Sequence, residues 1–282
     1  MKPEFLVTVV ALICWMLLGP PYPAVEERPV SLPAVVYSSD LQQVPGLGVS
    51  EISLNCSGAK LFLESQQNGD GSWSGGYADA IGGIVGETAL VAFTLMDHGC
   101  SPKSTVIEEA LEFVNKYCQS DGGIYNNSGY AMWDHDVYTT AAAIVAFTKA
   151  MELDSSLRLT YAPIVKRART YLLNAQVLST NSDGSRSPKD GGWFRISRNH
   201  PEANSWASFY PDIYSTYFAI KALLSTEDGL PDQVRQRAVA FVKRCYLGAG
   251  MGFSQTPQSV TKTDNEATSC AAAMATAIFV LT

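Results

Sequence analysis

The sequence contains little that would build a metal centre or a nucleic-acid-binding surface. Its 282 residues include three histidines and six cysteines, and no two cysteines have the C-x-x-C spacing of common zinc sites. Acidic residues outnumber basic ones, 27 against 20, so the formal net charge is −7. An acidic chain without a basic cluster disfavours nucleic acid and anionic membrane surfaces as partners. We therefore expect no metal, no cofactor and no nucleic acid.

The longest apolar run lies at the N-terminus. Residues 6–19 form one apolar run, whose length is typical of a signal-peptide core and short for a membrane span. We expect residues 1–24 to be a signal peptide, with an uncleaved N-terminal anchor as the alternative, and residues 25–50 to be a linker. The protein is then exported, whether periplasmic, on the cell surface or secreted. The anchor alternative leaves membrane association open.

Charged residues are also sparse, and an internal repeat runs through the rest of the chain. Charged residues make up 17% and apolar residues 46%, which excludes a disordered chain and provides a large core. Four segments share a helix, a Gly-rich turn ending in an aromatic residue, and a second helix of smaller side chains. The turn aromatics are Trp73, Tyr125, Trp193 and Phe253. Such a repeat predicts an array of similar units with a shared core.

The two helices of each repeat differ in character. Residues 105–116 carry charges at surface spacing beside Leu111 and Phe113, as in an amphipathic outer helix. Residues 139–148 carry no charge and several alanines, as in a helix buried on all sides. We predict an all-α fold for residues 51–282, an α/α toroid with about four inner and outer helix pairs in an incomplete ring.

The turn sequences carry a family resemblance. Gln67 to Trp73 fits the Q-x-x-x-G-x-W motif of squalene cyclases, and Gln119 to Tyr125 fits it with Tyr in place of Trp. The chain resembles the prenyltransferase and squalene-oxidase/cyclase repeat family, which folds as an α/α toroid, over roughly residues 52–282. The resemblance implies an apolar, isoprenoid-like ligand in a central cavity. Closed family members have more helix pairs, so we expect either missing C-terminal repeats or an open arc that closes by self-association.

The loop before residue 138 carries the densest chemistry. Asp134, His135 and Asp136 are consecutive, and two carboxylates with a histidine can form an acid–base site. Squalene cyclases protonate an alkene with a D-x-D-D acid, and Asp134 and Asp136 match its first and third positions. Val137 stands at the fourth position. These three residues are the candidate catalytic residues, and whether the protein is an enzyme stays open.

One of these carboxylates also has counterparts elsewhere in the chain. Asp136, Asp212 and Asp264 each stand just before the corresponding inner helix. An aspartate that recurs at one position of a repeat is better explained as a helix N-cap than as a catalytic acid. Asp134 has no such counterpart.

Aromatic side chains gather near the same loops. Rings that face a cavity suit an isoprenoid chain or a cationic intermediate, although aromatics at helical spacing more often fill a core. The candidate ligand-binding residues are Trp133, Tyr138, Trp206, Tyr210, Asp212, Tyr214 and Asp264. The polar insertion at residues 177–189 is either a lid or a tolerated loop.

Three functions stay open at this point. The first is an exported squalene cyclase-like repeat protein that binds an apolar small molecule or lipid and, if catalytic, acts as a terpenoid cyclase. The second is a carbohydrate-active α/α-toroid enzyme, because residues 190–193 and 263–268 loosely resemble pectate-lyase segments. The third is a protein-interaction scaffold. A zinc-dependent prenyltransferase is disfavoured, because Tyr214 replaces the cysteine of its Asp-x-Cys pair and no histidine follows.

Overall fold

A computed structural model describes residues 58, 60–73, 81–126, 136–196, 211–248, 252–254, 256–257 and 278. The predicted signal peptide or anchor (residues 1–24) and the linker (residues 25–50) lie outside the described residues. In the ranges that are described, no helix is both long enough and apolar enough to cross a membrane. The described residues belong to two compact units: residues up to 67 form part of the first, and residues 68–73 and 81 onward belong to the second.

The first unit is described through one short helix at residues 60–65. Lys60 Nζ and Glu64 Oε1 lie 4.0 Å apart across one helical turn. Two apolar side chains of this helix point to solvent, because Leu61 is 65% and Phe62 57% exposed. The helix stands where the sequence predicts the outer helix of the first repeat.

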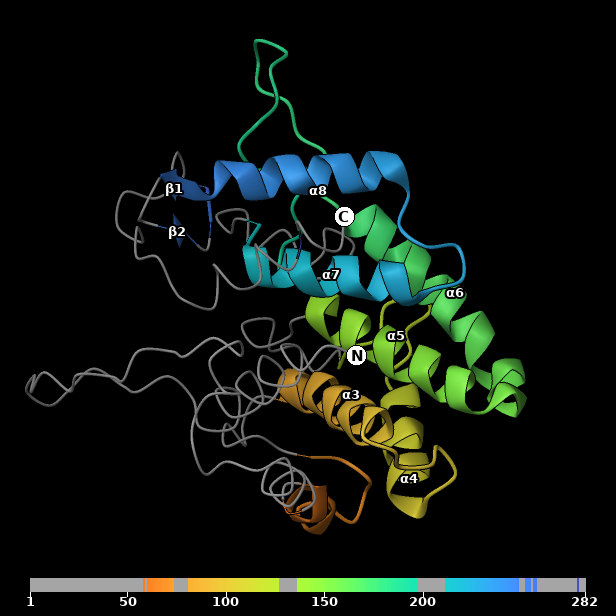
Figure 1. The fold of residues 1–282 in the computed structure, drawn as a ribbon. Coiled ribbons are helices and arrows are strands. Elements are labelled where there is room, and N and C mark those ends of the chain that lie inside the picture. Colours follow the sequence, from red (N-terminus) through yellow and green to blue (C-terminus); the bar gives the residue numbers. More distant parts are fainter. Residues whose placement is uncertain are drawn as a thin grey trace, which may run out of the picture. The chain divides into compact units, whose positions relative to one another are not determined.

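The second unit alternates inner and outer helices, as the sequence predicts (Figure 1). The inner helices are α3 (Ile81–Asp97), α5 (Asp136–Leu153) and α7 (Ile213–Ser225). The outer helices are α4 (Thr105–Asn115), α6 (Arg158–Ala175) and α8 (Asp232–Arg244). A 3-10 turn, η2 (Ser155–Leu157), links α5 to α6. The antiparallel pair β1 (Tyr246–Gly248) and β2 (Gly252–Phe253) follows α8 and was not predicted.

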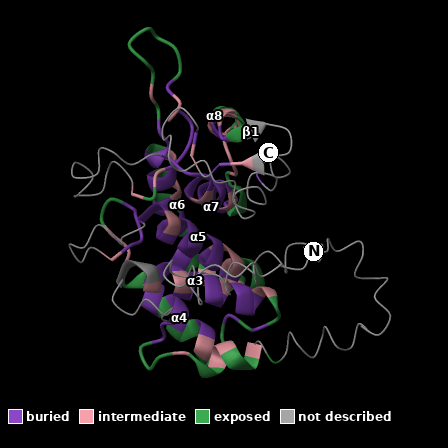
Figure 2. Cartoon of the chain, turned by 90° about the vertical axis from the view of Figure 1, so that its left-hand side faces the viewer, coloured by how far each residue is buried: buried purple, intermediate pink, exposed green. Residues whose placement is uncertain are grey.

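Burial separates the two kinds of helix (Figure 2). Every residue from Thr139 to Phe147 in α5 is buried, and this helix packs against α3, α6 and α7. Its alanines let the neighbouring helices approach closely. In α4, by contrast, Glu108 and Glu109 are exposed, whereas Leu111 is 1% exposed. The predicted difference between inner and outer helices is therefore confirmed for the described repeats.

A single turn conformation recurs between outer and inner helices. Each turn has a glycine with positive φ directly after an aspartate: Gly71 (89°), Gly122 (96°) and Gly191 (91°). A side chain at any of these glycines would collide with a backbone carbonyl of the next outer helix, at Glu109 in α4, Arg167 in α6 and Arg237 in α8. Glycine is therefore required twice, for the backbone conformation and for the close approach.

A threonine of each inner helix holds the preceding turn. The Oγ1 atoms of Thr88, Thr140 and Thr216 accept hydrogen bonds from the backbone N–H groups of Trp73 (3.0 Å), Ile124 (2.9 Å) and Trp193 (3.1 Å), respectively. These bonds define the repeat register, in which Asp136 and Asp212 are equivalent, as the sequence predicted.

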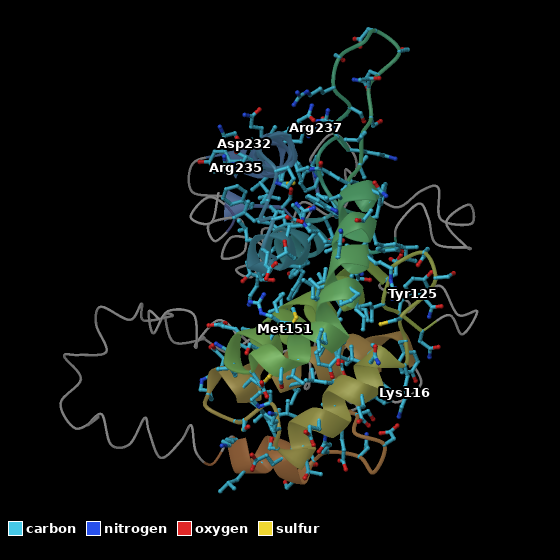
Figure 3. The ribbon with its side chains drawn as sticks, turned by 90° about the vertical axis from the view of Figure 1, so that its right-hand side faces the viewer. Lys116, Tyr125, Met151, Asp232, Arg235 and Arg237 are labelled. Carbon is cyan, nitrogen blue, oxygen red and sulfur yellow. The ribbon has the colours of Figure 1, made fainter. Side chains whose placement is uncertain are left out.

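The second turn corrects one part of the sequence interpretation. Ile124, and not Tyr125, is the equivalent of Trp73 and Trp193. In each turn the residue at this position donates its backbone N–H to the threonine of the inner helix, and this bond does not depend on the side chain. Tyr125 lies one residue further along and donates its hydroxyl to Asp121 Oδ2 at 2.9 Å (Figure 3). The match of the second turn to the cyclase motif is therefore offset by one residue.

The insertion at residues 177–189 forms a hairpin, of which residues 180–186 are exposed. Thr180 pairs with Arg186, and the Asn181 N–H donates to the Ser185 carbonyl at 2.7 Å. Below the hairpin, Gln176 Nε2 donates to the carbonyls of Gly191 and Val234, both at 3.0 Å. The Gln176 amide thus holds the third turn against α8. The insertion can therefore extend from the repeat without changing the position of this turn.

Gly122→Ala is expected to destabilise the protein more than Gly99→Ala, although both glycines have a φ near 90°. An alanine at either position costs about 1–2 kcal/mol for its backbone conformation. At Gly122 the new Cβ would also lie 2.7 Å from the Arg167 carbonyl oxygen, whereas Gly99 has nothing within 4 Å. Urea unfolding should show a further loss of about 1–3 kcal/mol for Gly122→Ala. Equal losses would show that the turn does not depend on this close approach.

Candidate functional site

The candidate site is the side of α3, α5 and α7 that points away from the repeat threonines. A helix turns by about 100° per residue. The residue two positions before each threonine, and the residues two, five and nine positions after it, therefore lie about 140–200° around the helix from the threonine side chain. We call this set the inner face. It consists of Gly86, Leu90, Phe93 and Asp97 on α3, Tyr138, Ala142, Val145 and Lys149 on α5, and Tyr214, Phe218, Lys221 and Ser225 on α7.

The N-terminal end of the inner face is aromatic. The rings of Tyr138 and Phe218 meet edge to face, with centroids 4.8 Å apart and planes at 83°. A Cβ at Gly86 would lie 2.6 Å from Tyr138 Cε1, so the glycine makes room for this ring between α3 and α7. Burial, assisted by the nearby Glu87, raises the pKa of the Tyr138 phenol above its ordinary value. The phenol is therefore a neutral hydrogen-bonding group at physiological pH.

Lys221 lies at the middle of the inner face. Its Nζ atom is 4.8 Å from the centroid of the Phe93 ring, a cation–π geometry that joins α7 to α3. The equivalent residue on α5, Val145, is 5% exposed, and its small side chain lets the two neighbours meet across α5. Burial lowers the pKa of Lys221 from 10.5 to about 8, with Asp97 opposing the shift.

The C-terminal end of the inner face is charged. Lys149 Nζ lies 3.1 Å from Asp97 Oδ1 and 3.6 Å from Glu152 Oε2. The Lys149 and Asp97 side chains are 17% and 13% exposed, so their ion pair is largely shielded from water. Thr148 Oγ1 also donates to Ser225 Oγ at 3.2 Å, which ties α5 to α7 at this end.

Asp212 caps α7, which confirms the N-cap interpretation of this residue. Its Oδ1 accepts the Ser215 N–H at 2.7 Å, and its Oδ2 accepts from Arg195 Nε at 3.2 Å. Burial raises the pKa of this carboxyl, while the Arg195 guanidinium and the Ser215 bonds oppose the rise. Both carboxylate oxygens are thus held by structural partners.

Asp136 is the equivalent residue of α5 and is fully buried. Its Oδ1 accepts the Val137 N–H at 2.8 Å, and its Oδ2 accepts the hydroxyl of Tyr171 from α6. The Val137 N–H also lies 3.3 Å from the Arg195 carbonyl. Arg195 therefore links the N-terminal ends of α5 and α7, and the two carboxylates are brought to one end of the inner layer.

The predicted site residues divide into described and undescribed ones. Asp136, Tyr138, Asp212 and Tyr214 are described: the two tyrosines lie on the inner face, and the two aspartates begin the helices that carry them. The remaining predicted residues lie outside the described part of the chain: Trp133, Asp134, His135, Trp206, Tyr210 and Asp264. Among the described residues, no three His, Cys, Asp or Glu side chains gather as a metal site would require.

The sequence did not predict a role for Phe93, for Lys221 or for Tyr171, the partner of Asp136. A signal for Lys221 was present, because it is the single charged residue of the α7 sequence. When the inner helices are aligned on Thr88 and Thr216, Lys221 takes the position equivalent to Phe93. The Tyr171 contact joins residues that are 35 positions apart and left no local pattern.

Asp212→Ala is expected to lower the free energy of unfolding by about 1–2 kcal/mol, because α7 loses its N-cap. Asp154→Ala is the control: Asp154 accepts the Ser156 N–H at 2.9 Å and pairs with the exposed Lys103 at 2.7 Å, but it caps only the short η2 turn. Thermal or urea unfolding should show a smaller loss for the control. If the Asp154 variant lost as much stability, burial of the Asp212 cap would not be important.

The Lys221 amine is expected to titrate near pH 8, because burial disfavours its charged form. After reductive methylation with ¹³C-formaldehyde, the Lys221 resonance can be assigned with Lys221→Arg and followed against pH. Lys103 is the control, because its hydrogen bond to Asp154 raises its pKa above the ordinary value. A Lys221 midpoint as high as that of Lys103 would contradict the buried placement of the amine.

Comparison with known proteins identifies the fold. No protein-family model matches the sequence, and no curated protein is found as a relative. Among solved structures, the chain is similar to the type II terpene cyclase MstE from Scytonema in complex with geranylgeranyl dihydroxybenzoate, at 16% identity and a TM-score of 0.51. A second MstE structure, in complex with merosterolic acid A, gives 15% and 0.50.

The alignment with the substrate complex covers 84% of this chain and 59% of the cyclase, and that with the product complex 84% and 60%. The chain thus spans about three-fifths of the length of these cyclases. At this level of identity the likeness concerns the fold. It confirms the predicted all-α architecture of inner and outer helices, the α/α-toroid class to which this terpene cyclase-like fold belongs.

Proposed function

We propose that this protein is an exported, terpene cyclase-like repeat protein that binds an apolar, isoprenoid-like molecule along the inner face. Export is supported by the apolar run at residues 6–19. Ligand binding is supported by the inner face itself, and a catalytic role is assigned to none of the described residues.

The observation that carries the proposal is that three aromatic residues of the inner face are partly exposed on helices whose residues are mostly buried. Phe93, Tyr138 and Tyr214 are partly exposed, one on each inner helix, whereas most of their neighbours are buried. Leaving aromatic surface in water is unfavourable by about 25 cal/mol per Å². A ligand that covers these rings recovers this free energy, and the π faces suit the flat, branched chain of an isoprenoid.

The fold comparison supports the same ligand class. The MstE structures hold geranylgeranyl dihydroxybenzoate in one case and merosterolic acid A in another. A terpene cyclase-like fold is therefore able to hold an isoprenoid chain, and the inner face offers a surface of matching chemistry in this protein.

The two carboxylates at the N-terminal ends of α5 and α7 have structural partners. Asp136 accepts from Val137 and Tyr171, and Asp212 accepts from Ser215 and Arg195, so each carboxylate stabilises the fold. Protonation chemistry would instead depend on Asp134 and His135, which lie outside the described residues.

Tyr214→Ala is expected to weaken binding of geranylgeraniol about tenfold, because the ligand loses the contact with one aromatic ring. Tyr246→Ala is the matched control, since Tyr246 is 48% exposed on β1 and lies outside the inner face. Titration of the full chain by isothermal calorimetry measures both dissociation constants. Absence of binding to the unaltered chain, or equal weakening by the two variants, would contradict the proposed function.

A further inference from the structure

The turn glycines give the outer helices a common register. Each glycine meets the backbone of one residue in the next outer helix, and the contacted residues are Glu109 in α4, Arg167 in α6 and Arg237 in α8. The residue that follows is in each helix a fully buried alanine: Ala110, Ala168 and Ala238. The three outer helices are therefore equivalent position by position.

The outward charges of these helices change sign in this register. Four positions are exposed or partly exposed in all three helices: the contacted residue, the one before it, and those three and six residues after it. On α4 the charged residues at these positions form an acidic face: Glu108, Glu109 and Glu112. On α6 and α8 they form a basic face: Lys166, Arg167, Arg237 and Lys243.

The charges of the two faces are not paired within the described part of the chain. None of the seven side chains forms an ion pair with a described residue, whereas other charges of the outer helices do: Arg158 with Glu227, Arg169 with Asp228, and Arg235 with Asp232. Of the lysines beside α4, Lys103, on which Glu108 acts, pairs with Asp154 at 2.7 Å, and Lys116 acts on Asp70. Both faces therefore keep charge that a partner of opposite sign can pair.

The same imbalance extends beyond the two faces. Carboxylates outnumber lysines and arginines in residues 81–126 and 136–153, and the reverse holds in residues 158–196 and 211–248. Within the second unit, α4 and α8 lie on opposite sides of α5 (Figure 1). A second copy of the chain can bring together what one molecule keeps apart, because its α4 presents three carboxylates to the four cations of the basic face.

We propose that the basic face of α6 and α8 binds the acidic face of α4 in a second copy of the chain. The contact is non-covalent and consists of carboxylate–ammonium and carboxylate–guanidinium pairs. Because the two faces differ, the contact is head to tail, and each molecule in a dimer keeps one face free for a further copy. This inference does not depend on the ligand proposed for the inner face.

Sedimentation velocity of the full chain tests the contact. The unaltered protein is expected to associate at about 0.01 M salt and to be monomeric at about 1 M, because the Debye length falls from about 30 Å to about 3 Å. An acidic-face variant (Glu108→Lys, Glu109→Lys and Glu112→Lys) should associate about tenfold more weakly, since like charges then meet. A basic-face variant (Lys166→Glu, Arg167→Glu and Arg237→Glu) should lose association to the same extent.

An equimolar mixture of the two variants is expected to restore association, because one variant carries basic side chains on both faces and the other carries acidic ones. The matched control reverses three exposed carboxylates outside the acidic face (Glu152→Lys, Asp183→Lys and Glu227→Lys) and should associate like the unaltered chain. Circular dichroism checks that each variant keeps its helices, and the single reversals Glu109→Lys and Arg237→Glu replace any triple variant that does not.

Four results would overturn the proposed contact. They are an unaltered chain that stays monomeric at low salt, association that persists in either variant, a mixture that stays monomeric, and a control that loses as much association as the acidic-face variant. None of these results bears on ligand binding along the inner face.

Discussion

The close approach of each turn glycine to the backbone of the next outer helix is the constraint on which the described repeats depend. Gly71, Gly122 and Gly191 have positive φ and leave no space for a side chain beside the next helix. Because the turn is fixed to an outer helix on one side and to an inner-helix threonine on the other, it sets the rotation of the inner helix. That rotation decides which residues reach the inner face, so the site follows from the turns.

Because the turns set the rotation of each inner helix, a helix such as α5 can be buried on almost all sides and still contribute residues to a site. Its threonine side is hydrogen-bonded to the turn, and its alanines pack against neighbouring helices. The opposite side carries Tyr138, Val145 and Lys149, which belong to the inner face along which we propose that a ligand binds. The same positions on α3 and α7 bring Phe93 and Lys221 together although they are far apart in sequence. A repeat thus turns identical backbone geometry into a face whose chemistry varies from helix to helix.

Much of the fold could be predicted from the sequence, because the governing signals are local. Several local features indicate their own surroundings: the charges of α4 indicate an exposed face, the alanine-rich stretch of α5 indicates burial, and the Asp-Gly pairs indicate turns. Asp212 was correctly interpreted as a cap. The register of the second turn was not predictable from side-chain type, since Ile124 occupies an aromatic position and Tyr125 follows it. The partners of Asp136 and Lys221 come from other helices, so the site required the packed structure. The loop residues Asp134 and His135 keep their status as predicted candidates.

We propose that an isoprenoid-like molecule lies along the inner face of α3, α5 and α7. A geranylgeranyl photoprobe with a diazirine on its chain tests this claim directly, with crosslinked peptides located by mass spectrometry of the full chain. We predict crosslinks to α3, α5 and α7 that disappear when excess unlabelled geranylgeraniol is added. Crosslinks concentrated on the exposed sides of α4, α6 and α8, or crosslinks that survive this competition, would contradict the claim.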